Sequence, residues 1–83
     1  MQSYDEILAT LCKVLQRHAN ADMVVVEDTL LASDLGIDSA QLMEVLLDVE
    51  DEFDISIPLN VLPNVYTVKD LNVELEKLLR ASG

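Results

Sequence analysis

Hydrophobic residues recur at helical spacing in three stretches of the chain, with apolar positions three and four residues apart. Each stretch opens on two residues, three positions apart, that are typical of helix N-termini: Ser3 and Glu6, Asp38 and Gln41, Thr67 and Asp70. The pattern therefore predicts three helices. The first runs from about Tyr4 to Ala19 or Asn20, the second from Ser39 to Phe53 or Asp54, and the third from Val68 to about Arg80, with residues 81–83 frayed.

The apolar faces of the first and third predicted helices are continuous and predict a common core. These faces consist of Tyr4, Ile7, Leu8, Leu11, Val14, Leu15 and His18 in the first helix, and Val68, Leu71, Leu75, Leu78 and Leu79 in the third.

The predicted helix over residues 39–54 has apolar residues on both sides. Winding it at about 100° per residue places a core stripe on one side: Leu42, Val45, Leu46, Val49 and Phe53. The opposite side holds Ala40, Met43, Glu44, Leu47, Asp51 and Asp54. Two large apolar residues therefore lie among acids on a face that should be solvated. Isolated apolar residues are common on surfaces, so chance competes with a docking role for this face.

The connections between these helices complete an all-α prediction. Residues 20–38 are expected to form an ordered loop across the bundle, with a turn at residues 28–31 and with Val24, Val26, Leu30, Leu31 and Leu35 holding it in place. After an extended segment before Pro58, residues 59–62 have room for one short helical turn, limited by Pro63. The fold predicted for residues 1–83 is one small bundle of three main helices plus a short third helix, with a long loop between helices one and two.

Charge restricts the possible partners. The chain has 16 acidic and five basic residues, a net charge of −11. Such a negative field argues against binding to nucleic acids or anionic membranes and favours basic protein partners. Cys12 is the only cysteine, and no long apolar run or signal sequence is found. We therefore expect a cytoplasmic monomer without stable membrane insertion.

No set of residues predicts catalysis or metal binding. Cys12 lies at the edge of an apolar face and has no basic neighbour, which favours a half-buried structural thiol. His18, the only histidine, is expected to interact with the C-terminal end of the first helix or to stack, because a second base or ligand is missing. The acids at residues 48–54 lack the spacing of a calcium loop. The sequence therefore predicts neither an enzyme nor a metal site.

The run Leu35-Gly36-Ile37-Asp38-Ser39 at the start of an acidic helix resembles the phosphopantetheine attachment site of acyl carrier proteins. The similarity covers essentially the whole chain and runs without a gap from residue 34 to residue 68, including Glu50-Asp51-Glu52-Phe53 at the helix end. The resemblance implies that Ser39 carries 4′-phosphopantetheine, installed from coenzyme A by a separate Mg²⁺-dependent phosphopantetheinyl transferase. It implies a role in carrying acyl thioesters for fatty-acid, lipid or polyketide biosynthesis.

The resemblance also implies a partner-binding surface. Its acids would be Asp38, Glu44, Glu50 and Asp51, which meet basic patches on acyl-loading and acyl-processing enzymes. Its apolar positions would be Ala40, Met43 and Leu47. Three departures from the family pattern suggest a specialised carrier: Ala40 replaces a large apolar residue, Gln41 replaces an acid, and residues 59–62 carry no charge.

Two alternatives remain open. An aminoacyl or peptidyl carrier usually has a different pair before the serine, often Gly-His, so that Ile37 and Asp38 favour acyl cargo. The chain could instead be an unmodified acidic interaction domain that docks basic partners through the second helix. Attachment of the arm requires only a serine hydroxyl, so the lack of a catalytic base is consistent with the carrier interpretation.

Overall fold

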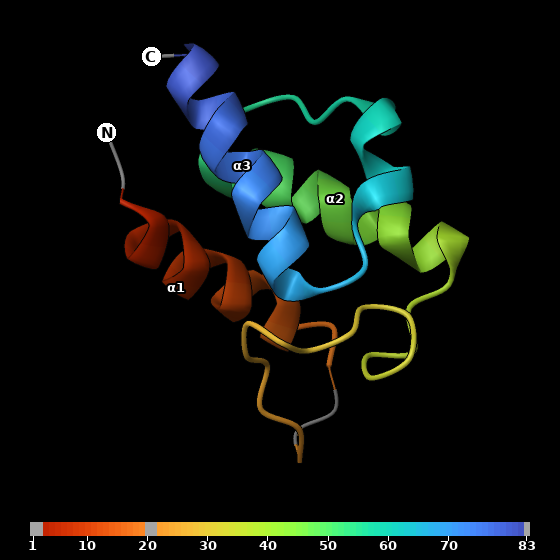
Figure 1. Cartoon of the computed structure of the whole chain (residues 1–83). Helices are drawn as coiled ribbons and strands as arrows, with labels where there is room; N and C mark the ends of the chain where they lie inside the picture. The colour runs from red at the N-terminus through yellow and green to blue at the C-terminus, as the bar shows by residue number, and fades with distance from the viewer. Residues whose placement is uncertain (1–2, 20–21, 83) are drawn as a thin grey trace.

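The computed structural model describes residues 3–19 and 22–82, with the side chains of residues 39, 59, 61, 62 and 82 left out of the description. Its elements are α1 (Tyr4–Gln16), α2 (Ser39–Phe53), the 3₁₀ helix η1 (Leu59–Asn64) and α3 (Val68–Ser82). The described chain contains no strand, and its one β-bridge joins Leu30 to Thr67. The all-α prediction is confirmed, including the short helix and the long loop before α2 (Figure 1).

The capping pairs predicted from the sequence start two helices through complete capping boxes. Ser3 Oγ accepts from Glu6 N at the start of α1, and Asp38 Oδ1 accepts from Gln41 N at the start of α2. At the start of α3, Thr67 Oγ1 accepts from Asp70 N at 3.1 Å. Helix starts are therefore determined locally, because each cap satisfies backbone N–H groups that have no partner within the helix.

Helix α1 ends at Gln16, so the predicted end at Ala19 or Asn20 is wrong for the described residues; Asn20 itself lies outside them. The next three N–H groups bond three residues back in a tightened turn, for example His18 N to Leu15 O at 2.9 Å. The Gln16 side chain then turns to the loop. Its Nε2 donates to Met23 O at 2.6 Å, and its Oε1 accepts from Val25 N at 3.1 Å.

The later helices extend slightly further than predicted. Helix η1 continues through Pro63 to Asn64, which a 3₁₀ helix allows because a short helix needs few N–H donors. Helix α3 is helical to Ser82 rather than ending at Arg80.

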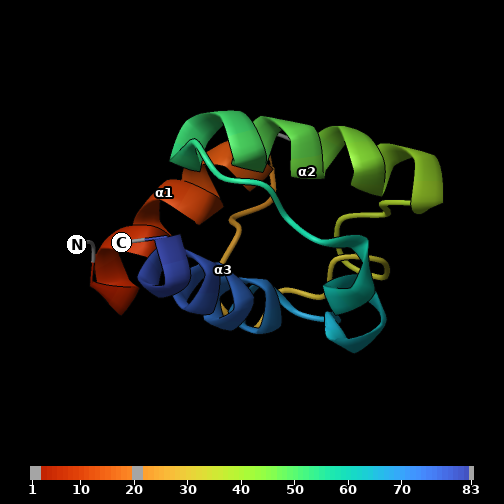
Figure 2. The ribbon, with the colours of Figure 1, turned by 90° about the horizontal axis from the view of Figure 1, so that it is seen from above.

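The core lies where the three α-helices meet. Helix α1 packs against α3 and α2, and Figure 2 shows α2 above α3 with α1 to the left of them. The fully buried apolar side chains come from the predicted apolar faces: Ile7, Leu11, Val14 and Leu15 of α1, Val45 and Val49 of α2, and Val68, Leu71 and Leu75 of α3. Leu42, predicted to be in the core stripe, is only half-buried. Burial of these side chains provides most of the free energy that stabilises the fold.

Residues 22–38, the described part of the long loop, are ordered as predicted, but different side chains hold them. Val25 and Leu31 are buried, whereas Val24, Val26 and Leu30 are exposed, so three of the five predicted positions are wrong. Leu31 is confirmed, and Leu35 packs partly against the core. The loop is also fixed by polar groups, since buried Thr29 accepts from Val26 N through Oγ1 at 2.9 Å. In extended backbone adjacent side chains point to opposite sides, so burying Val25 turns both of its neighbours outward.

Candidate functional site

The turn before α2 presents the start of that helix at the surface. Gly36 adopts φ +65, and beyond Gly36 and its two chain neighbours no heavy atom lies within 4 Å of the position that a Cβ would take. Ile37 holds the turn against the core, because its side chain is buried and its N–H donates to Leu31 O at 3.3 Å. A glycine is favoured here because L side chains rarely adopt this backbone conformation and are strained in it.

Asp38 fixes the first turn of α2. Its Oδ1 accepts from Gln41 N at 2.8 Å, and its own N–H donates to Gln41 Oε1 at 3.3 Å. Gln41, which departs from the family pattern, thus completes the capping box. Ser39 is the first residue of α2, and the residues that flank it, Asp38, Ala40 and Gln41, are exposed. The backbone around Ser39 is therefore held by a capping box and approachable, at the positive end of the helix dipole.

The outward face of α2 has the helical phase that the sequence predicts. Met43 is 44% exposed and Leu47 is 59% exposed, while Val45 and Leu46 between them are buried. Ala40, Glu44 and Asp51 are also exposed. We call Ala40, Met43, Glu44, Leu47 and Asp51 the α2 face. It has an apolar centre with acidic neighbours, and its role in partner binding stays a prediction.

Glu50 has an internal role that the sequence did not indicate. Its Oε2 accepts from Ile57 N at 2.7 Å, and its carbonyl oxygen accepts from Ile55 N at 3.1 Å. The same carbonyl accepts from the N–H of Asp54, which ends α2 in a left-handed conformation with φ 54. Glu50 therefore holds the connection from α2 toward η1, and a partner that recruited its carboxylate would have to compete with the Ile57 N–H group.

His18 is bound to a carboxylate. Its Nε2 lies 2.6 Å from Asp48 Oδ2, and this contact links the end of α1 to the middle of α2. The predicted interaction with the end of its own helix, or stacking, is not what the structure records. The two residues are 30 positions apart, so no local pattern identifies the pair.

The other candidate chemical groups are structural. Cys12 is half-buried, as predicted, and burial followed by the charge of Glu27 raises the pKa of its thiol. A higher pKa reduces the thiolate fraction and therefore the reactivity. Within residues 3–19 and 22–82, no group of His, Cys, Asp or Glu side chains could hold a metal ion. The same residues contain no helix that is long and apolar enough to span a membrane.

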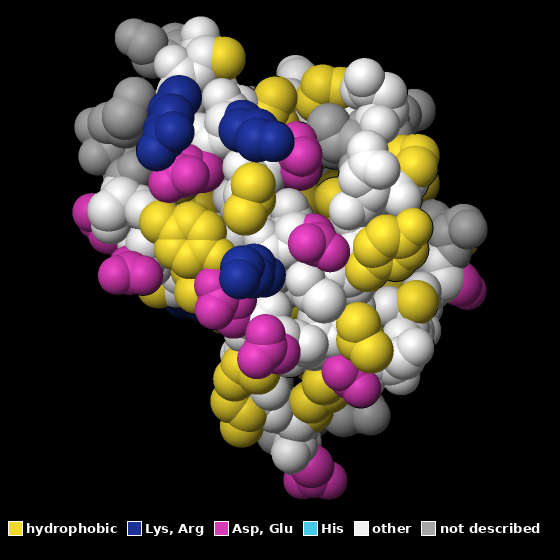
Figure 3. All heavy atoms as spheres, viewed as in Figure 1, with side chains coloured by type: hydrophobic (Ala, Val, Ile, Leu, Met, Phe, Trp, Pro, Cys, Tyr) yellow, Lys and Arg dark blue, Asp and Glu magenta, His cyan; other side chains and the backbone are white. Residues whose placement is uncertain are grey.

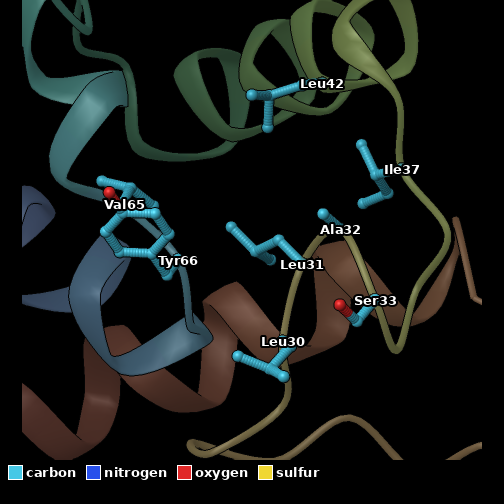
Figure 4. A pocket seen from close by; sticks show the side chains of 8 residues that line it. All are labelled: Leu30, Leu31, Ala32, Ser33, Ile37, Leu42, Val65 and Tyr66. Carbon is cyan, nitrogen blue, oxygen red and sulfur yellow. The ribbon is translucent and has the colours of Figure 1, made fainter.

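A mostly apolar pocket of about 150 Å³ lies beside the start of α2. Figure 4 shows side chains from the loop, from α2 and from the segment before α3 around it. They are Leu30, Leu31, Ala32, Ser33, Ile37, Leu42, Val65 and Tyr66. Ile37 and Leu42 lie two residues before and three residues after Ser39, so the pocket and Ser39 are at the same end of α2. Sequence reasoning missed this pocket because its walls come from three separate segments.

Comparison with known proteins gives a consistent set of similarities. Residues 5–71 match the family model described as a phosphopantetheine attachment site. The chain is 34% identical over 71 residues to an acyl carrier protein of Kocuria rhizophila, covering 84% of this chain and 88% of the other. It is 40% identical over 70 residues to a probable acyl carrier protein of Caulobacter vibrioides, covering 84% and 77%. It is 31% identical over 80 residues to an acyl carrier protein of Thermotoga maritima, covering 95% and 99%.

Proposed function

The chain belongs to the phosphopantetheine attachment-site family, and we propose that it is an acyl carrier that bears its 4′-phosphopantetheine arm on Ser39. As a carrier it is not itself a catalyst. When attached, the group supplies a thiol at the end of a flexible arm, which holds acyl groups as thioesters. The acyl assignment follows the acyl carrier proteins to which the chain is similar over most of its length.

One observation carries the assignment of Ser39. The family match covers three serines, Ser33, Ser39 and Ser56, and Ser39 alone begins a helix. Ser33 lies in the loop beside the pocket, and Ser56 lies in the connection that Glu50 holds. The Gly36 turn and the Asp38 cap leave open backbone around Ser39, which fits a residue that must enter the active site of another enzyme.

The chemistry required of this chain is small. The Ser39 oxygen forms a bond to the phosphate nearest the pantetheine in coenzyme A, the bond from that phosphate to the nucleotide half breaks, and the serine proton passes to a base of the transferase. Asp38 and Gln41 maintain the helix start so that Ser39 is presented in one backbone conformation. A preorganised residue loses less conformational entropy when the transferase binds it.

The pocket supports apolar cargo. Seven of its eight lining residues are apolar or aromatic, and Ser33 is the exception. An apolar cavity of about 150 Å³ holds a ligand of roughly benzene size. The pocket therefore fits a short hydrocarbon segment of a thioester held near Ser39, and it favours an acyl group over a charged aminoacyl group.

We further propose that the α2 face docks the transferase and the acyl-processing enzymes. Met43 and Leu47 supply apolar area, while Glu44 and Asp51, together with Asp38 beside Ser39, attract basic surfaces. Exposed charges act mainly on association rates, and covered apolar side chains act on complex lifetime.

We also propose a cytoplasmic location, which the single cysteine supports because it offers no intramolecular disulfide.

Mass spectrometry of the intact protein tests the attachment residue. The wild type, Ser39→Ala, Ser33→Ala and Ser56→Ala are each incubated with coenzyme A, Mg²⁺ and a broad-specificity phosphopantetheinyl transferase. We expect every protein except Ser39→Ala to gain one phosphopantetheine mass, because the arm needs this one hydroxyl. A gain by Ser39→Ala, or a loss confined to Ser33→Ala or Ser56→Ala, would place the arm elsewhere. A wild type that gains no mass would instead support the unmodified interaction domain.

A further inference from the structure

A second set of exposed apolar residues lies away from the α2 face. Val24 is 76% exposed, Val26 51%, Leu30 40% and Tyr66 67%. We call these four residues the loop face. Three come from the long loop, and Tyr66 comes from the segment that leads into α3. Together they expose more large apolar side chains than the α2 face, whose large apolar members are Met43 and Leu47.

The loop face is built on fixed backbone. Leu31 N donates to Tyr66 O at 3.0 Å, Val68 N donates to Thr29 O at 3.0 Å, and Leu30 forms its bridge with Thr67. The inward positions are taken by Val25 and Leu31, which are 6% and 5% exposed. The exposed side chains therefore cannot turn inward without breaking this arrangement. The bridge and the pocket bring Leu30 and Tyr66 together, and exposed apolar groups on an ordered surface are typical of interaction sites.

Acidic residues lie in the same loop as these apolar residues. Asp22, Asp28 and Asp34 are exposed in the same loop, and residues 18–66 contain no lysine or arginine. Figure 3 shows acidic and hydrophobic side chains mixed over the lower part of the molecule, with the basic side chains above them over α3. The nearest base along the bridged segments is Lys69, whose backbone N–H donates to Glu27 O at 2.9 Å.

These charges indicate which kind of partner the loop face could bind. A second copy of this chain would bring another net charge of −11 against the acids of the loop, and nucleic acid would be repelled for the same reason. We propose that the loop face is a second docking surface, separate from the α2 face, and that it binds a protein surface with an apolar centre and a rim of lysine and arginine.

The loop face is continuous with the pocket. Leu30 and Tyr66 belong to the loop face and also line the pocket, opposite Leu42 of α2 (Figure 4). A partner on the loop face would therefore cover the pocket wall while leaving the α2 face accessible. If the proposed cargo site is right, a partner on the loop face senses whether the pocket is filled, and this consequence rests on the proposed function.

A titration followed by nuclear magnetic resonance tests the second surface. The probe is a synthetic amphipathic helical peptide of leucine and lysine, added to the protein without its arm, so that the result does not depend on attachment at Ser39. We expect amide shifts at residues 24–31 and 66–68 as well as along α2. The double variant Val26→Ser, Tyr66→Ser should weaken binding at the loop face about tenfold, because two covered apolar side chains are lost.

The matched control is Leu47→Ser, which should weaken the α2 response and leave the loop-face affinity within about twofold. If the double variant fails to fold, Val24→Ser, at the most exposed of the four positions, replaces it with a smaller expected loss. Shifts confined to α2 would overturn the proposal. Loop-face binding with unchanged affinity in the serine variants would also overturn it, because charge alone would then account for the attraction.

Discussion

The two ends of the chain differ sharply in charge from its middle. Residues 1–17 and 67–83, which contain α1 and α3, hold five acids and five bases and are neutral in total. Residues 18–66, which contain the long loop, α2 and η1, hold the other 11 acids and no base, so the whole net charge of −11 lies there. The ends add no net charge and supply seven of the 15 buried apolar core residues in the described part of the chain, and the middle supplies the other eight. The acidic middle carries the turn, Ser39, the pocket and both exposed apolar faces.

This division concerns charge rather than packing, because the middle also buries core residues such as Val45 and Val49. What the middle adds is the acids that would attract basic partners. Acids near the C-terminal end of α2 are unfavourable for the helix, since no basic residue lies in its last turn to balance the helix dipole. Helix α1 has the opposite arrangement, with Asp5 and Glu6 in its first turn and Lys13 in its last. The acids near the end of α2 therefore lower the stability of the fold, and their placement fits a surface that must attract basic partners.

The largest expected effect separates the two sides of α2. Leu46 is 4% exposed, whereas its neighbour Leu47 is 59% exposed. Leu46→Ala should lower the free energy of unfolding by about 2 to 5 kcal/mol, because it leaves a cavity in the core. Leu47→Ala should change it by less than about 0.5 kcal/mol. Urea unfolding of both variants provides the measurement, and equal losses would show that the orientation of α2 is wrong.

The next largest expected effect concerns a hydrogen bond that joins the neutral N-terminal region to the acidic middle. The Tyr4 hydroxyl of α1 donates to Glu27 Oε2 of the loop, and this bond, followed by burial and the Glu27 charge, raises the pKa of Tyr4 to about 12 from 10.0. The raised pKa stabilises the protonated phenol in the fold. Its contribution is therefore fully present below pH 10 and is lost as the pH rises through about 12.

Tyr4→Phe tests this joint. At pH 7 it should destabilise the protein by about 1 kcal/mol, the usual value for one hydrogen bond. The gap between the wild type and Tyr4→Phe should then close between pH 10 and pH 12. Urea midpoints measured against pH for both proteins give the comparison, and a gap that stays constant to pH 12 would rule out the bond as the cause.

The smallest expected effect is a change in stability whose sign differs between α1 and α2. Asp5 lies at the favourable end of α1, and Asp51 lies near the unfavourable end of α2. Asp5→Asn should therefore destabilise the protein, and Asp51→Asn should stabilise it, each by about 0.3 to 1 kcal/mol at low salt. Both effects should shrink as salt shortens the screening length to about 8 Å. Thermal melting at two salt concentrations measures both changes. If the two variants change stability in the same direction, the helix dipole does not explain the difference between α1 and α2.

Features that depend on neighbouring residues could be predicted from the sequence. The caps at Ser3, Asp38 and Thr67 each act within three residues, so all three helix starts were predicted correctly. The phase of α2 was also predictable, since a helix repeats at fixed angular spacing and its apolar stripe identifies the buried side. The motif that ends at Ser39 is equally local, and for that reason the family could be identified before the fold was known.

Features that depend on distant contacts could not be predicted. Helix α1 ends earlier than predicted, and Gln16 at its end bonds to Met23 and Val25 of the loop. His18 contacts Asp48, which lies 30 positions away in the sequence. In the loop, the sequence offers adjacent valines that suit either side of an extended segment. The orientation with Val25 inward is held by side chains outside this run, since Gln16 Oε1 accepts from Val25 N and Thr29 Oγ1 accepts from Val26 N. The pocket beside Ser39 also required three segments to be brought together in space.

The claim that the acids of the middle segment attract partners, while those of the neutral ends do not, is tested most directly by matched charge reversals. Glu44→Lys on the α2 face and Asp5→Lys on α1 change the net charge equally, and the rate of arm attachment by the phosphopantetheinyl transferase is measured for both. We expect Glu44→Lys to slow attachment about tenfold at low salt and to recover as salt is added, because surface charges steer association. Asp5→Lys should stay within about twofold of the wild type. Equal slowing by both variants would contradict the account, since net charge rather than the α2 face would then control the encounter.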